Sequence, residues 1–243
     1  MQPVLTECDD RLVIATRQHD RLRTLLSATI EKNPFYKKKL IDVGLSTAPI
    51  PHRIDLTDLP VTTKRELIGD QEEHSPWGSA LSEPIECYTR YTQTSSTTGK
   101  PLRWLDTNES WQWMLECWKA VYRAARVGPG DRVFFAFSFG PFLGFWTAFE
   151  AAAQIGAHAI PAGGMSTRQR LALIAAVSPT VVCCTPTYAL RLAEVAAEQA
   201  ADQAALAEST VRAVIVAGEP GGSIPATRQR IEQAWGARVF DQN

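Results

Sequence analysis

The chain has 243 residues, of which 45% are hydrophobic and 21% are charged, and its formal net charge is −1. This composition is ordinary for a globular protein. A net charge near zero gives no electrostatic basis for binding nucleic acid or an anionic membrane surface, so we expect neither as a partner.

Two features bear on the compartment and on metal binding. Residues 133–149 carry no charge, but Gly140 and Pro141 interrupt this run, and its 17 residues are at the lower limit for a membrane span. A buried strand, a loop and a helix explain the run better. The acidic N-terminus is unlike a signal peptide, so we expect a cytoplasmic protein. The five cysteines and four histidines lack metal-ligand spacing, which predicts buried thiols and no metal site. The cysteines are Cys8, Cys87, Cys117, Cys183 and Cys184.

Residues 1–84 are expected to form a helical, loop-rich region without a sheet. An apolar stripe predicts a first helix, which should end before Asn33-Pro34 because a residue preceding proline disfavours the helical conformation. A second, short helix should follow at residues 35–43, with Gly44 just beyond its end. The stripe of the first helix consists of Leu12, Leu22, Leu25, Leu26 and Ile30.

Further along, two local patterns predict helix starts and a pair of strands. Thr63 and Glu66 have the spacing of a capping box, and Asn108 is expected to cap a longer helix. Residues 85–92 and 102–105 are typical of strands, with a polar loop between them. The longer helix has a predicted buried stripe of Trp111, Met114, Leu115, Trp118, Tyr122 and Ala125.

After residue 128 the chain alternates between apolar strands and helices, which predicts an α/β fold with a mostly parallel sheet flanked by helices. We therefore expect a second domain, residues 85–243, with ligands at the carboxyl ends of its strands. The expected strands are 133–137, 157–161, 181–184, 213–216 and 239–240, and the expected helices are 142–155, 168–177, 188–199 and 225–235.

The loop from Thr94 to Pro101 is the most informative segment. Residues 94–98 all carry hydroxyl groups, and Gly99 and Lys100 follow, so the loop can offer backbone and side-chain donors to a polyphosphate. A solvated hairpin loop would have the same composition. The loop is not a Walker A motif, because Pro101 stands where that motif needs Ser or Thr.

This loop resembles the phosphate-binding signature of adenylate-forming enzymes, T-S-G-T-T-G-K-P, at seven of eight positions, with Ser96 in place of the first glycine. Other segments are similar to the phenylacetate–CoA ligase branch of that family. They are Asn33–Tyr36, Leu59–Lys64, Ser178–Leu190 and Gly218–Pro220. Together they extend over most of the chain, in the same order as in the family.

The resemblance implies three groups of ligand-binding residues. The β- and γ-phosphates of ATP would contact Ser95, Ser96, Thr97, Thr98, Gly99 and Lys100. The adenine pocket would be lined by Gly218, Glu219 and Pro220, with Asp241, Gln242 and Asn243 completing it. The carboxylic acid would bind among Phe139, Gly140, Phe142, Gly163 and Gly164. Without the resemblance, the phenylalanines could be core, the glycines a turn and Glu219 a solvated acid.

The reaction implied by the resemblance has two steps and uses ATP, Mg²⁺ and CoA. A carboxylate, in this branch an aryl acid such as phenylacetate, attacks the α-phosphorus to give an acyl-adenylate and pyrophosphate. The CoA thiol then displaces AMP. The family's residues for Mg²⁺, CoA and catalysis lie beyond Asn243, so we assign no catalytic residue, and we expect this chain to be a truncated, inactive part, as a possible homodimer.

Two other functions fit the same residues. The acceptor of the adenylyl group could be a phenolic cofactor, as in the related coenzyme F-390 synthetases. Alternatively, the chain could be a nucleotide-binding module, or half of a split enzyme, without turnover of its own.

Overall fold

The computed structural model describes residues 10–45, 54–95, 99–199 and 206–242. The chain divides into two compact units, residues 1–111 and residues 112–243, and each is described by itself. The predicted division after residue 84 concerns the functional subdomains and remains a prediction.

The first unit begins with two helices that meet at Asn33. Helix α1 spans Arg11–Lys32 and α2 spans Pro34–Asp42, so the predicted end before Asn33-Pro34 is confirmed. The Asn33 side chain accepts a hydrogen bond from the backbone N–H of Tyr36 at 3.1 Å and thereby caps α2. Gly44 follows α2 with φ of +82°, the left-handed conformation that glycine adopts without strain.

The apolar stripe predicted on α1 is only partly buried. Leu26 packs with Leu40 of α2 in a small core, and Leu22 and Ile30 contact it. Leu12 and Leu25, which belong to the same stripe, are 75% and 62% exposed. A stripe read with a period of three to four residues cannot distinguish positions that have a neighbouring element from positions that have none. Core partners such as Ile54 and Leu59 come from later in the chain.

Helix α3, Lys64–Glu73, is joined to a small antiparallel sheet. Its start is the predicted capping box, in which Thr63 and Glu66 exchange hydrogen bonds. Strand β1, Tyr88–Gln93, pairs with β2, Arg103–Thr107. Residues 85–87 form a 3₁₀ turn instead of the predicted strand start. The Gln71 side chain both accepts from Arg103 N–H and donates to Arg103 C=O, so α3 is attached to the edge of β2.

Helix α4, Asn108–Ala124, has the predicted buried stripe and begins within one residue of the predicted cap. Its cap is Thr107, whose hydroxyl accepts from the backbone N–H of Ser110 at 3.1 Å, and the prediction of Asn108 as the cap was wrong by one residue. Asn108 is the first helical residue and instead accepts from the Thr89 hydroxyl. The predicted stripe is buried except at Met114, which is half-buried.

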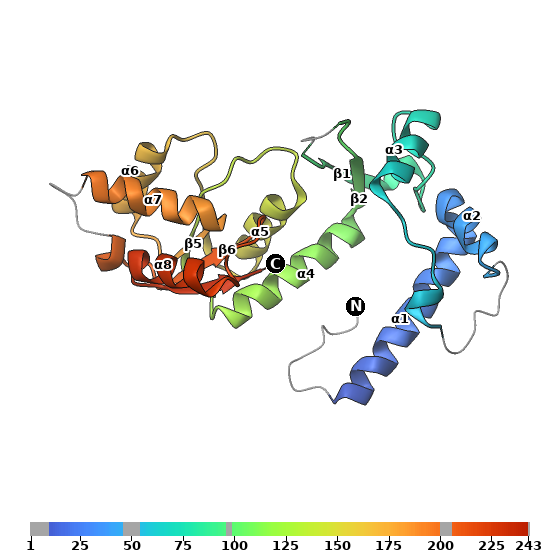
Figure 1. The fold of residues 1–243 in the computed structure, drawn as a ribbon, viewed down its shortest axis with the longest axis horizontal. Coiled ribbons are helices and arrows are strands. Elements are labelled where there is room, and N and C mark those ends of the chain that lie inside the picture. Colours follow the sequence, from blue (N-terminus) through green and yellow to red (C-terminus); the bar gives the residue numbers. More distant parts are fainter. Residues whose placement is uncertain (1–9, 46–53, 96–98, 200–205, 243) are drawn as a thin grey trace. The chain divides into compact units, whose positions relative to one another are not determined.

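The second unit is built on a five-stranded parallel sheet in the order β4-β3-β5-β6-β7, of which Figure 1 labels β5 and β6. All five predicted strands are present, with ends shifted by at most two residues. The strands are β3 Arg132–Phe135, β4 His158–Pro161, β5 Val181–Cys184, β6 Ala213–Val216 and β7 Arg238–Asp241. The central strands β5 and β6 are buried at every position, which explains their unbroken apolar sequence.

The helices cover the two faces of this sheet unequally. They are α5 Leu143–Gln154, α6 Thr167–Val177, α7 Pro186–Gln199 and α8 Pro225–Trp235. Buried residues of α6, α7 and α8 share one core with alternate strand residues, including Phe134, Val182 and Val214, and Figure 1 shows these helices in the orange and red part of the chain. Helix α5 lies on the other face, where Phe149 packs against Phe135 at 5.3 Å between ring centroids.

This arrangement follows from the handedness of parallel connections. The chain leaves β3 for β4 on one side, then returns across β3 to β5 and continues to β6 and β7. Because right-handed crossovers in opposite directions place their helices on opposite faces, α5 is separated from α6, α7 and α8. The α/β class expected from the sequence is confirmed.

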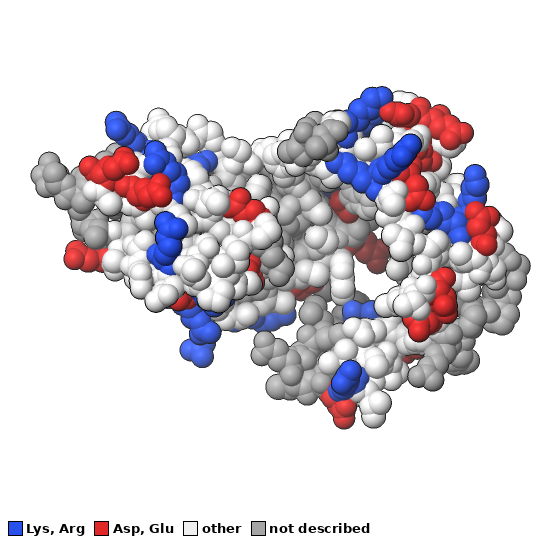
Figure 2. Space-filling view, viewed as in Figure 1, with Lys and Arg blue, Asp and Glu red and all other residues white. Residues whose placement is uncertain are grey.

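Other expectations have mixed outcomes. No helix among the described residues is long and apolar enough to cross a membrane. Cys183 and Cys184 are buried, but Cys87 and Cys117 are exposed, so the prediction of buried thiols was wrong for that pair; Cys8 lies outside the described residues. On the face that Figure 2 shows, acidic and basic side chains are interspersed on both units, as a net charge near zero suggests.

Candidate functional site

The loops that follow the five parallel strands lie together at one edge of the sheet. The strand order reverses direction between β3 and β5, and this kind of switch point is where open α/β sheets bind ligands. The predicted acid-binding residues follow β3 and β4. The predicted adenine-binding residues follow β6 and β7. The edge therefore collects both predicted groups within the second unit.

The loop after β3 carries Phe139, Gly140 and Phe142, and α5 holds its shape. The indole N–H of Trp146 donates to the Gly140 carbonyl at 2.9 Å, and the Trp146 ring packs on Phe139 with centroids 5.0 Å apart. Phe142 folds back over Gly140, where an added Cβ would lie only 2.7 Å from the Phe142 ring. Gly140 is thus needed for this close approach.

The loop after β4 lies directly against the loop after β3. A Cβ added to Gly163 would meet the Phe139 ring at 2.9 Å and the Phe137 carbonyl at 3.2 Å. Gly164 has φ of +74°, which favours glycine. Below it, the buried Arg170 of α6 donates to the Ala162 carbonyl at 2.9 Å and so fixes the start of the loop. The predicted acid-binding residues therefore form one contiguous aromatic and glycine surface.

The loop after β6, Gly218 to Ser223, is held by the neighbouring helix α7. Glu219 accepts from the backbone N–H of Thr187 at 2.8 Å and from its hydroxyl at 2.5 Å. Burial raises the pKa of Glu219, but the hydrogen bonds from Thr187 and Thr185 outweigh this effect and leave the pKa lowered. Glu219 is therefore a carboxylate at neutral pH, and it occupies donors of the first turn of α7.

The far end of the same loop is held by β7. The Ser223 hydroxyl donates to Asp241 at 2.5 Å, and Gly222 fits so closely that an added Cβ would lie 2.7 Å from the Asp241 carboxyl carbon. Gln242 is exposed and continues the pairing, because its N–H donates to the Val216 carbonyl at 3.0 Å. Asp241 thus shapes the loop, and Asn243 lies outside the described residues.

Phe145 of α5 connects the two groups and was not predicted as a site residue. Its ring stacks on Phe137 with centroids 3.8 Å apart and an interplanar angle of 21°. The same ring approaches within 3.6 Å of the position of a Gly218 Cβ. Its spacing of three residues from Phe142 is a helical period and was the available sequence signal. Thr187 and Trp146 were also missed as site residues. Thr187 contacts a loop 32 residues away in sequence, and Trp146 acts on its loop through a single N–H.

The hydroxyl-rich loop belongs to the first unit. Its base is closed by two hydrogen bonds at 3.0 Å, from Thr94 N–H to the Leu102 carbonyl and from Leu102 N–H to the Thr94 hydroxyl. Ser95, Gly99 and Lys100 are exposed, and the Lys100 ammonium pairs with Glu72 of α3. The predicted residues Ser96, Thr97 and Thr98 lie outside the described residues.

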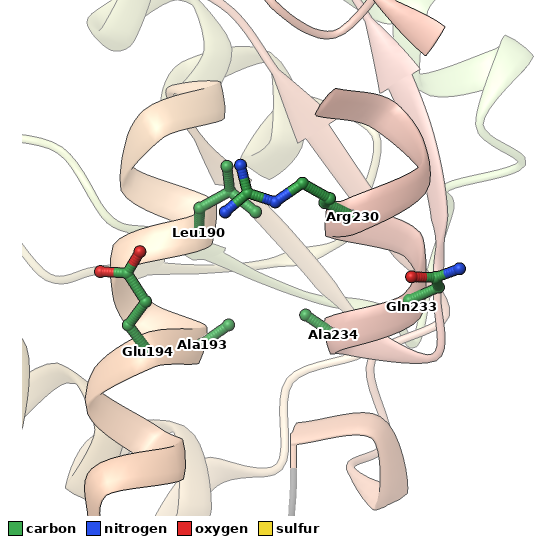
Figure 3. Close-up of a pocket in the computed structure, with 6 residues that line it drawn as sticks. All are labelled: Leu190, Ala193, Glu194, Arg230, Gln233 and Ala234. Atoms are coloured by element: carbon green, nitrogen blue, oxygen red, sulfur yellow. The ribbon is translucent and has the colours of Figure 1, made fainter. Parts of the chain in front are cut away.

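A groove elsewhere on the second unit does not involve these residues. It lies between the outer sides of α7 and α8 and has a volume of about 350 Å³ (Figure 3). Its lining is Leu190, Ala193, Glu194, Arg230, Gln233 and Ala234. Among the described residues, no group of three or more His, Cys, Asp or Glu side chains is arranged to hold a metal ion.

A comparison with known families identifies the family of the chain. The sequence model described as "AMP-binding enzyme" matches residues 1–241. This chain belongs to the AMP-binding enzyme family. The resemblance inferred from the loop 94–101 and the later segments is thereby confirmed.

Relatives within the AMP-binding family are acid–CoA ligases. The phenylacetate–coenzyme A ligase of Escherichia coli K12 is 28% identical over 99% of this chain and 53% of its own length. The ligase of the same name from Pseudomonas putida is 30% identical over 94% of this chain and 50% of its own. The chain therefore spans about half the length of these relatives.

A solved structure shows the same fold. The 2-hydroxyisobutyryl–CoA ligase in complex with 2-HIB-AMP and CoA superimposes with a TM-score of 0.85 at 27% identity, over 98% of this chain and 52% of that one. A second structure of that ligase, in an open conformation, gives a TM-score of 0.84 over 98% of this chain.

Proposed function

We propose that this chain is the ATP- and carboxylic-acid-binding part of an AMP-forming acid–CoA ligase that acts on an aryl acid. The observation that carries the proposal is the carboxyl edge of the sheet, where the aromatic loop after β3 and the glycine loop after β6 share Phe145. An acyl-adenylate joins an acid to AMP in one molecule, so its two halves need adjacent surfaces of these two kinds.

The preference for an aryl acid rests on the lining after β3. Phe139 and Phe142, both partly exposed, present rings that suit offset or edge-to-face packing with an aromatic substrate. The curated relatives carry phenylacetate in their names, which supports the same choice. The matching ligase for 2-hydroxyisobutyrate carries a small aliphatic acid in its name, and such an acid is the competing substrate class.

The chemistry assigned to this chain is binding and charge neutralisation. The acid's carboxylate oxygen attacks the α-phosphorus, a P–O bond to pyrophosphate breaks, and CoA thiol later displaces AMP. Lys100 and the hydroxyl-rich loop would hold the outer phosphates, with Mg²⁺ arriving on the nucleotide. Glycines at the strand ends allow the backbone to approach the adenosine half closely.

A non-hydrolysable acyl-adenylate tests the proposal on the chain as it exists. We expect calorimetry to show that phenylacetyl sulfamoyl adenosine binds at least about a hundredfold more tightly than AMP, because both surfaces are used at once. An isobutyryl analogue should bind more weakly than the phenylacetyl one. Equal affinities for AMP and for both analogues would overturn the proposal.

A further inference from the structure

Resting on the proposed nucleotide site, we infer that Glu219 is a positioning residue that shapes the adenosine-binding loop through Thr187, and is not itself a nucleotide ligand. The resemblance to the family placed Glu219 in the lining of the pocket. The geometry assigns its carboxylate a partner within the protein.

The first argument is the direction of the carboxylate. One oxygen, Oε1, accepts both the Thr187 amide and the Thr187 hydroxyl. Thr187 is in the first turn of α7, where backbone N–H groups have no partner within the helix. A carboxylate at this place also interacts favourably with the helix dipole. Two hydrogen bonds and the helix dipole therefore all hold the Glu219 carboxylate against the start of α7.

The second argument is that the rest of the loop is already fixed. Gly221 has φ of +154°, and a Cβ added to it would lie 2.8 Å from Pro186 Cβ, so the loop backbone is in contact with the start of α7. Arg228 of α8 donates to the Gly222 carbonyl at 3.0 Å, and Ser223 donates to Asp241. Gly218, whose φ is +89°, lies at the other end of the loop. We infer that the backbone conformation at this end is held by the contact of Glu219 with Thr187.

The consequence concerns the shared part of the nucleotides. The backbone from Gly218 to Pro220 would contact the adenosine half, which ATP and AMP have in common. Loss of the Glu219–Thr187 contact, which holds this backbone, should therefore lower the affinities for ATP and AMP by the same factor. A direct contact of Glu219 with adenine would also weaken the binding of both nucleotides, but the affinities would then not respond to Thr187→Val.

The experiment compares variants of Glu219 and Thr187 in the whole chain by calorimetry with ATP and with AMP. We expect Glu219→Ala to lower the affinities for ATP and for AMP by about tenfold each, the loss typical of a charged hydrogen bond. Thr187→Val should weaken both by a smaller factor, since the amide donor remains, and Thr187→Ser should restore the affinity. The losses of Glu219→Ala and Thr187→Val should be less than additive when combined.

A matched control and a second measurement separate the possible failures. Glu194→Ala removes an exposed glutamate of α7 that pairs with Arg191 at 3.3 Å, and it should change neither affinity. Exchange of the Thr187 amide proton, followed by NMR, should accelerate at least about tenfold in Glu219→Ala, because this proton loses its acceptor.

Two outcomes would overturn the inference. If wild type binds both nucleotides and Glu219→Ala binds them equally well, or loses ATP alone, Glu219 does not position the adenosine loop. If Thr187 exchange is unchanged, the contact itself is absent. A wild-type chain that binds neither nucleotide, but shows the change in Thr187 exchange, would instead overturn the proposed function and leave the contact confirmed.

Discussion

The Lys100 ammonium lies 2.5 Å from the Glu72 carboxylate, and this ion pair joins the hydroxyl-rich loop to α3. The side chains of Lys100 and Glu72 are 72% and 51% exposed, so solvent screens the pair and it contributes little to stability. An exchangeable partner of this kind keeps the ammonium at the loop. A polyphosphate can replace Glu72, because it offers several anionic oxygens.

Replacement of Lys100 by alanine is expected to lower the affinity for ATP about tenfold and the affinity for AMP less than about twofold, since the lysine should contact the outer phosphates. Calorimetry with the two nucleotides measures both effects. The exposed Lys64 at the start of α3 provides the matched control, and Lys64→Ala should leave both affinities unchanged. Equal losses of ATP and AMP in Lys100→Ala would contradict the assignment of Lys100 to the outer phosphates.

Replacement of Glu72 by glutamine should have the opposite effect on ATP. Without the competing carboxylate, we expect ATP to bind about two- to threefold more tightly at an ionic strength of about 0.01 M, and the gain should vanish near 1 M as salt screens exposed charges. The affinity for AMP should be the same in Glu72→Gln and wild type at both salt concentrations. A gain that persists at high salt would show that Glu72 acts by some route other than charge.

A third prediction concerns the contact between the loops after β3 and β4. Gly163→Ala adds a methyl group where the Phe139 ring and the Phe137 carbonyl already stand, so the aromatic loop must move. We expect phenylacetyl sulfamoyl adenosine to bind about tenfold more weakly, with AMP nearly unchanged.

Gly144→Ala is the control for this change, because a Cβ at Gly144 meets nothing within 4 Å. Gly144 lies in the first turn of α5, where alanine should stabilise the helix by about 0.5–1 kcal/mol. If Gly163→Ala reduced the affinities for AMP and the analogue by the same factor, the contact with Phe139 would not define an acid-binding surface.

The sequence predicted the second unit well because its strands are buried on both faces. An unbroken apolar run such as 181–184, set between predicted helices, is typical of a strand buried on both faces. The strand order was not predicted, because it depends on pairing between segments that are distant in sequence. The first unit was harder. Leu12 and Leu25 fit a helical stripe, but exposure depends on which elements pack nearby, and local periodicity does not contain that information.

The candidate site shows the same division between local and distant information. The resemblance to the family, not a local pattern, suggested Gly140 and Gly163 as site residues, and the structure shows that both have tight surroundings. The contact between Glu219 and Thr187 joins residues 32 positions apart, and no local pattern in either segment indicates it. The ring of Phe145 was likewise unassigned, because its contact with the Gly218 region exists only after β3 and β6 are placed in one sheet.

The last prediction concerns Asp131, which joins the amino ends of the strands. Its carboxylate accepts from the Thr180 hydroxyl at 2.7 Å, from Gly128 N–H at 3.0 Å and from Arg212 at 2.8 Å. Burial raises the pKa of Asp131, but these three donors outweigh burial and leave the pKa lowered. Ionised Asp131 therefore stabilises the folded protein above the carboxyl pKa of the unfolded chain.

Asp131→Asn should lower the free energy of unfolding by on the order of 2 kcal/mol at pH 7, because a charge-assisted set of bonds is lost. The difference from wild type should be lost as the pH falls from the ordinary carboxyl range through the lowered pKa, since Asp131 then becomes protonated in both states. Urea unfolding at several pH values, with the exposed Asp42→Asn as control, measures this dependence. A destabilisation that stays constant down to the acid limit would mean that the charge of Asp131 is not what holds Thr180 and Arg212 in place.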